Sequence, residues 1–221
     1  MGIPNIDLYL VALFRSFFVL AQGEGQTLID DLFEGHPQAE ISSIKSYLRR
    51  HVMTSDTRQR SDDQPHIYFI ENYPLADIPF PQICVTVGNE TTSEHFLGDE
   101  TGQQEIVTDS EGTVLAVDKE NTVFSRGAWS VDVVASSKRE VVWLSRLCQL
   151  AIFSNLDQLA SVGLTEVDLS VADMRLDPQF YPQVAPARRI SVTGLVSQTW
   201  SVRVEAVQYQ SGINLAIDDN L

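Results

Sequence analysis

Apolar and polar positions in the first 60 residues follow a helical spacing. Apolar side chains recur every three or four residues over 6–22, which predicts a helix that Asn5 caps and Gly23 and Gly25 end. Its apolar residues lie on nearly every side, so we expect other elements to cover most of this helix. A short helical piece is predicted over 27–33, and a third helix over 37–52.

Four later segments have the composition and the period of two that are typical of strands, namely 66–71, 82–88, 128–135 and 165–172. In the last of these, Val167, Leu169 and Val171 are expected to point inward. The polar stretch 89–125 predicts a surface excursion from the sheet. Inside it, 105–107 and 113–117 flank a turn-rich tetrapeptide and predict a hairpin.

The segment 189–207 carries apolar residues at even positions and predicts either one long bent strand or two strands in the same phase. At about 3.3 Å per residue the full run would span roughly 60 Å, which is longer than a small domain needs. We therefore expect an arm that reaches a neighbour, or a bend at Gly194.

The main helix is predicted over 137–162. Ser137 and Glu140 have the spacing of a capping box, and Gly163 ends the helix in a left-handed conformation. Its core stripe is expected to consist of Val141, Leu144, Leu147, Cys148, Ala151 and Ile152. Trp143 lies off this stripe, either in local packing or as an anchor at a subunit interface.

Consecutive strands around one helix predict an α+β domain with a mixed, mostly antiparallel sheet and helices on one face. An acidic β-hairpin excursion and an N-terminal helical segment complete it. We expect a single domain over 1–221. Its parts would be N-terminal helices at 5–53, a flexible linker at 54–64, the sheet and main helix at 65–207, the excursion at 89–125, and a tail at 208–221.

Negative charge is concentrated in the middle of the chain. The formal net charge is -15, and residues 61–135 hold 14 Asp+Glu against 2 Lys+Arg, a difference of -12. Affinity for nucleic acid phosphates comes from Lys and Arg, so specific DNA binding is not expected. Such a surface would repel DNA, as suits the wall of a pore through which DNA slides.

The apolar stretch 8–21 is too short for the roughly 20 residues of a membrane span, and Arg15 interrupts it. It also lacks the basic start and the cleavage pattern of a signal peptide, so we interpret it as a buried helix. Cys84 and Cys148 are expected to be small buried hydrophobic residues without a disulfide. These features fit assembly in the cytoplasm.

No motif for phosphate binding or catalysis is present, and we expect no cofactor, metal or enzymatic activity. The histidines are His36, His51, His66 and His95, and none has metal-ligand spacing. His95 lies near Asp99 and Glu100 in a segment that is either a solvated loop or a small hydrolase or metal site. Glu90, Glu94, Asp99 and Glu100 could bind a hard cation such as Ca²⁺, but their spacing does not match the 12-residue loop pattern. Asp168 and Asp173 flank a strand end, where paired carboxylates can do acid–base work, but Asp168 has outward parity and is interpreted as surface charge.

A basic group lies at the end of the third predicted helix, where Lys45, Arg49 and Arg50 are followed by Arg58 and Arg60. It is either a solvated helix end or a surface that contacts the acidic middle third of a neighbouring copy. Opposite charges on separate surfaces of one chain would favour head-to-tail closure of a ring. Lys45, Arg49, Arg50 and Trp143 are therefore the candidate subunit interface.

Several short segments, taken in order, resemble tailed-bacteriophage neck and tail-completion proteins, including the tail-terminator group. The resemblance spans roughly residues 5–207. Its segments are Tyr73-Pro74, Phe80-Pro81-Gln82-Ile83, Phe96-Leu97-Gly98-Asp99, Ser125-Arg126-Gly127-Ala128-Trp129-Ser130-Val131-Asp132-Val133, Trp143-Leu144, Leu164-Thr165-Glu166-Val167-Asp168-Leu169-Ser170, Tyr181-Pro182 and Arg189-Ile190-Ser191-Val192-Thr193.

The resemblance implies a ring-forming virion protein, commonly a hexamer, that caps the tail tube and joins it to the head connector. Its partners would be other copies of itself and tail-tube, sheath or connector proteins, with DNA passing through the lumen. The excursion at 89–125 is longer than a minimal terminator needs. Two alternatives are another virion part, such as a head–tail adaptor or baseplate component, and a small enzyme or ligand-binding domain that uses the His95 loop.

Overall fold

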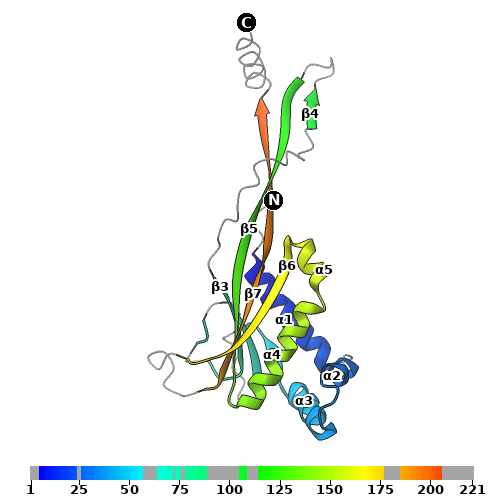
Figure 1. Ribbon diagram of the computed structural model, residues 1–221, viewed down its shortest axis with the longest axis vertical. Coiled ribbons are helices and arrows are strands. Elements are labelled where there is room, and N and C mark those ends of the chain that lie inside the picture. Colours follow the sequence, from blue (N-terminus) through cyan, green and yellow to red (C-terminus); the bar gives the residue numbers. More distant parts are fainter. Residues whose placement is uncertain are drawn as a thin grey trace.

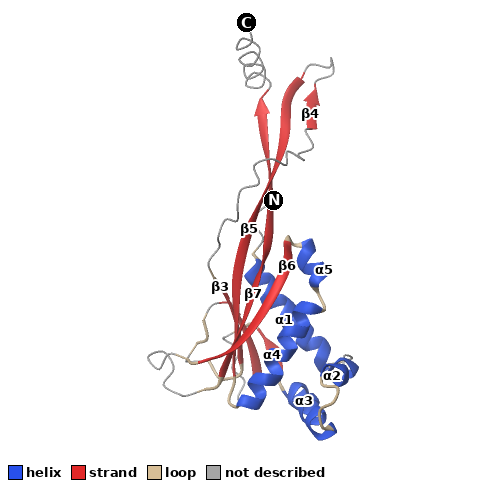
Figure 2. Ribbon diagram, viewed as in Figure 1, coloured by secondary structure: helices blue, strands red, loops and turns tan. Residues whose placement is uncertain are grey.

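The computed structural model has an α+β fold in which one mixed sheet packs against helices on one face (Figures 1 and 2). In the part of the chain that the structure describes, the sheet has seven strands: six lie in the order β1-β2-β3-β5-β7-β6, and β4 pairs with β5 off this path. The first three strands are parallel and the other pairs are antiparallel. The structure describes residues 5–23, 26–56, 64–71, 73–75, 78–88, 105–108, 114–176 and 185–205.

Five helices lie in this described part, namely α1 (Ile6–Gln22), α2 (Gln26–Leu32), α3 (Gln38–Arg50), α4 (Lys138–Phe153) and α5 (Leu156–Ser161). The three N-terminal helices confirm the prediction, although α3 ends at Arg50. The single helix predicted over 137–162 is wrong, because it is divided between α4 and α5. At the break the Asn155 side chain donates to the carbonyl of Ala151 at 2.7 Å, in competition with the backbone.

The strands are β1 (Val52–Thr54), β2 (His66–Glu71), β3 (Gln82–Val87), β4 (Glu105–Thr108), β5 (Val114–Val134), β6 (Leu164–Met174) and β7 (Ala187–Glu205). β1 was not predicted, and it replaces the expected helix end and the first residue of the expected linker. The rest of that linker lies mostly outside the described residues. The predicted hairpin is confirmed, since β4 pairs with the start of β5.

β5 and β7 are longer than the sequence suggested. We expected residues 113–117 to belong to an excursion separate from a core strand at 128–135, but β5 is one strand of 21 residues. The excursion boundary at residue 125 is therefore wrong, because residues 114–125 continue a strand of the main sheet. For β7 the structure selects the single long strand, which passes through Gly194 without interruption.

The core lies between the sheet and the covering helices. All six residues of the predicted α4 stripe are buried, and Phe18 of α1 meets Phe69 of β2 edge-to-face with ring centroids 5.3 Å apart. The expectation that α1 is covered on most sides holds for eight buried residues. It fails for Leu8, Val19 and Leu20, which are about half exposed.

The opposite face of the sheet carries a smaller apolar cluster of Tyr68, Ile70, Ile78 and Cys84. Gln82, whose side chain is fully buried, fastens the preceding loop over this cluster. Its amide donates to the carbonyls of Leu75 (2.8 Å) and Ile78 (2.7 Å) and accepts from the N–H of Leu75 (2.9 Å). A buried amide with three partners meets its hydrogen-bonding needs at this position.

Local signals in the second half of the chain are confirmed. Ser137 and Glu140 form both hydrogen bonds of the capping box, and Gly163 has a φ of 93°. Asn5 stands at the N-cap of α1, but its side chain makes no capping bond. In β6, Val167 and Leu169 are half-buried, while Val171 is 40% exposed. The three side chains that were expected to point inward are therefore less buried toward the end of the strand. None of the described helices is long and apolar enough to cross a membrane.

Candidate functional site

A two-stranded ribbon extends beyond the body of the domain (Figure 1). β5 and β7 pair without a register shift from Val134–Ala187 to Ala116–Glu205. β3 accompanies β5 only as far as Trp129, and β6 accompanies β7 only as far as Val196. Beyond these points residues 116–125 pair with 196–205, and β4 joins only at the far end. At about 3.4 Å per residue, this ribbon is roughly 30 Å long.

Two glycines mark the root of the ribbon, where Gly127 stands opposite Gly194. A Cβ at Gly127 would lie 2.3 Å from the Trp129 ring, and one at Gly194 would lie 2.6 Å from the Leu164 side chain and 2.9 Å from the Thr165 carbonyl. Gly127 thus leaves room for Trp129, two residues along the same strand, and Gly194 leaves room for Leu164 of the neighbouring β6. The expected bend at Gly194 is replaced by this close packing.

An ion pair that sequence reasoning missed fastens the base of β5 to the base of β7. The Arg189 guanidinium donates from two nitrogens to both carboxylate oxygens of Asp132, each at 2.7 Å. Asp132 is fully buried, while the Arg189 side chain is 39% exposed. The hydrogen bond to Asp132 raises the pKa of Arg189. This pair lies beside the smaller apolar cluster, since Asp132 stands opposite Cys84.

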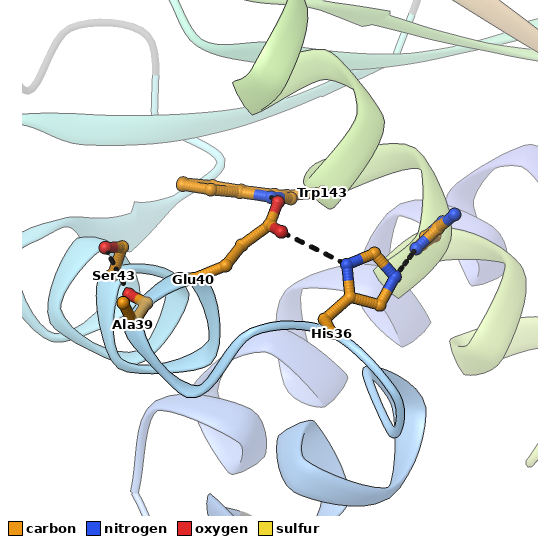
Figure 3. A network of polar contacts seen from close by, with 6 residues as sticks. His36, Ala39, Glu40, Ser43 and Trp143 are labelled. Carbon is orange, nitrogen blue, oxygen red and sulfur yellow. Dashed lines mark hydrogen bonds and ion pairs between the residues drawn. The ribbon is translucent and has the colours of Figure 1, made fainter.

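A polar network joins the N-terminal helices to α4 (Figure 3). The Glu40 carboxylate accepts from the Trp143 indole N–H at 3.1 Å and lies 3.2 Å from His36 Nδ1. These two hydrogen bonds, that of His36 first, lower the pKa of Glu40. Arg146 Nη1 lies 2.8 Å from His36 Nε2. Arginine can only donate, so Nε2 accepts and the proton of the neutral ring lies on Nδ1, facing Glu40.

This arrangement resembles a catalytic His–Glu pair in composition but differs from one in geometry. In a catalytic pair the second ring nitrogen faces substrate, whereas here Arg146 occupies it. Arg146 also lies over the Phe33 ring, 5.7 Å from its centroid. The network, here called the clamp, therefore joins α3 and the residues just before it to α4.

Trp143 belongs to this clamp, which corrects its predicted place off the core stripe. Its side chain is buried with only 6% exposure and meets Tyr47 at a centroid distance of 6.1 Å. Of the two interpretations that the sequence left open, local packing accounts for these contacts. The predicted core stripe of α4 is too narrow because α3 covers a second side of this helix, the side that carries Trp143.

The basic residues of the candidate interface do not act as one group. Lys45 forms an ion pair with Asp30 of α2 at 2.6 Å, so its charge is neutralised within the chain. Arg49 and Arg50 are exposed at the end of α3, where positive charge stabilises the helix dipole. Arg58 and Arg60 lie outside the described residues.

An open hollow of about 460 Å³ lies between α4 and the base of β6 and β7. Its polar lining includes Arg146, Gln149 and Arg188, and Arg188 is paired with Asp173 at 2.7 Å. Both arginines thus already have partners in the chain. Asp168 is exposed, as expected for surface charge.

Other candidates from the sequence are placed as follows. Cys84 and Cys148 are buried and unpaired, and burial raises the pKa of both thiols. His51 lies against Tyr47 with the two rings tilted, and His66 stacks on Tyr68. The described residues contain no group of three or more His, Cys, Asp or Glu that could hold a metal ion. The loop carboxylates and histidine at Glu90, Glu94, His95, Asp99 and Glu100 lie outside the described residues.

Comparison with known proteins leaves the ribbon as the main guide to function. No protein-family model matches the chain, and no curated protein matches it.

Proposed function

We propose that this chain is a structural subunit of a tailed-phage particle that assembles into a ring at the neck or upper tail, where it ends tail polymerisation and joins the tail tube to the head connector. The observation that carries the proposal is the β5–β7 ribbon. It extends roughly 30 Å beyond the strands that flank it in the body.

An isolated two-stranded ribbon is marginally stable in water, because it buries little apolar surface and leaves both edges unpaired. A ribbon of this length is therefore expected to fold against something. No helix of the described part covers it, since all five helices pack beside the body of the sheet (Figure 2). A neighbouring copy in a ring supplies such a surface for every ribbon at once.

Two further features support contact between copies. Three apolar residues of α1, Leu8, Val19 and Leu20, are left about half exposed by the other described elements. The acidic middle of the chain, 61–135, includes β5, whose ribbon part, 116–125, carries Asp118 and Glu120 against Lys119. A ring that carried this acidity toward its lumen would let DNA pass without binding it.

Native mass spectrometry together with negative-stain microscopy tests the proposal. We expect one discrete ring, most simply a hexamer, over a wide range of protein concentrations. A chain that stays monomeric over that range would overturn the proposal. Immunogold labelling of intact particles then separates the neck position from the alternatives of a head–tail adaptor or a baseplate component.

A further inference from the structure

Backbone groups on the outer edge of the β7 ribbon face away from β5. The N–H of Ser197 donates to the carbonyl of Gly163 at 2.9 Å, so the peptide groups of residue 197 point to the side where β6 ends. Peptide groups alternate sides along an antiparallel strand. The residues whose groups point the same way are therefore Thr199, Ser201, Arg203 and Glu205. No strand in the described part pairs with this edge beyond Val196.

The outer edge of β6 is open in the same sense. Thr193 has the same parity as Ser197 and faces its partner Asp168 on β6. Even-numbered residues of β6 from 168 onward thus face β7, and the odd-numbered ones face outward. The residues whose peptide groups face outward are therefore Leu169, Val171 and Asp173, because the register shift between Thr165 and Asp168 ends the regular alternation before Asp168. β6 ends the strand order, and none of the described strands pairs with it on that side.

We propose that residues 197–205 of one copy add as a strand to the outer edge of β6 in a second copy. The ribbon edge presents the peptide groups of four residues and the β6 edge those of three, and pairing of the two edges would satisfy most of these groups. The contact joins two different surfaces of the chain, so it is head-to-tail and can close a ring. This inference rests on the proposed ring and adds how neighbouring copies bind.

The ribbon cannot reach its own β6. Both segments lie along the same side of β7, one after the other, because β6 pairs with residues 187–196 and the open edge begins at 197. Folding the ribbon back would break its ladder with β5. The β6 edge that pairs with the ribbon must therefore belong to a second copy of the chain.

Ser201→Pro tests the inference directly. Its N–H points away from β5, so proline removes a donor only from the outer edge, which is where an edge strand tolerates proline. We expect an unchanged far-UV circular dichroism spectrum, with the concentration midpoint of assembly raised about tenfold or more in sedimentation velocity. Ser201→Ala, which keeps the N–H, should assemble like the parent. Parent-like rings from Ser201→Pro would overturn the inference.

Cysteine cross-linking identifies the partner edge and still decides the matter if Ser201→Pro fails to fold. Both native cysteines are buried, so thiols introduced at the surface react with little background. Single cysteines at 199, 201 or 203 are mixed with the Val171→Cys chain and oxidised with oxidised glutathione. We expect a disulfide-linked dimer in at least one mixture and none with cysteine at Leu156, an exposed control position on α5.

The outcomes separate the two proposals. Rings that form without any cross-link and tolerate Ser201→Pro leave the proposed function standing and overturn the strand addition. A parent chain that never assembles overturns both.

Discussion

β5 and β7 pass through two environments while keeping one continuous register. In the body, residues 129–134 of β5 lie between β3 and β7, and helices cover one face. In the ribbon, residues 116–125 have β7 as their flanking strand, joined by β4 at the far end. The same ladder thus contributes to a buried core in one half and projects from it in the other. The difference teaches that strand length need not follow core size, because both strands continue well beyond the residues that pack in the core.

Shortening the ribbon should break the comparison most completely. Deleting residues 119–122 together with 199–202 removes four matched pairs, from Lys119–Val202 to Thr122–Thr199. The even number preserves which face each remaining residue occupies. We expect assembly to be lost while the melting temperature of the monomer stays the same, measured by sedimentation velocity and calorimetry. A shortened chain that still forms rings would show that the ribbon is dispensable.

Arg189→Met should have the largest effect on the body. It leaves the Asp132 carboxylate buried and unpaired, which costs about 3–5 kcal/mol for a fully buried pair. Because the arginine is partly exposed, we expect about 3 kcal/mol in urea unfolding. The double variant with Asp132→Val should regain most of this, since an apolar pair replaces the ions. A single variant as stable as the parent would contradict the assignment.

Val131→Ala probes the same strand where it is packed. Val131 is fully buried, so loss of two methyl groups and the resulting cavity should cost about 2 kcal/mol. Assembly at low temperature should persist, because the ribbon is untouched. This pattern is the reverse of that expected for the shortened ribbon. If Val131→Ala abolished rings while the monomer stayed folded, the body would also be needed for assembly, and the division of roles between body and ribbon would be wrong.

Gly194→Ala examines the boundary between the two regions. The added methyl group would meet the Leu164 side chain at 2.6 Å and the Thr165 carbonyl at 2.9 Å. Overpacking of this kind costs about 1–3 kcal/mol, and the upper half applies here because the Thr165 carbonyl belongs to the backbone and cannot rotate away as the leucine side chain can. Thermal unfolding measures the loss. Gly35→Ala serves as a control without steric contact. Open space surrounds that glycine, so only its φ of 85° opposes the change.

The smallest expected effect is a pH dependence from His51, which lies in the body. Burial lowers the pKa of His51 below 6.5 in the folded state. The unfolded chain therefore binds more protons, so stability is full above about pH 6.5 and falls as the pH drops toward the folded pKa. Urea unfolding at pH 7.5 and 5.5 should show a shallower dependence for His51→Asn than for the parent. Equal slopes would contradict this account.

Local signals made much of the fold predictable. The capping box at Ser137, the left-handed Gly163 and the apolar spacing of α1 depend on neighbouring residues, so sequence suffices to find them. The ion pair between Asp132 and Arg189 joins residues 57 apart, and nothing in the local sequence links them. Trp143 was misplaced for the same reason, because the α3 residues that cover it are about 100 positions away.

The sequence by itself determined the elements of this protein, because helical and strand periodicities, caps and turns act over a few residues. It also indicated that 189–207 was too long for a small domain. Only the tertiary structure decided that β5 matches β7 along its full length, where β3 and β6 stop, and which edges remain open. These features depend on hydrogen bonds between distant segments, whose register is fixed only when the strands meet.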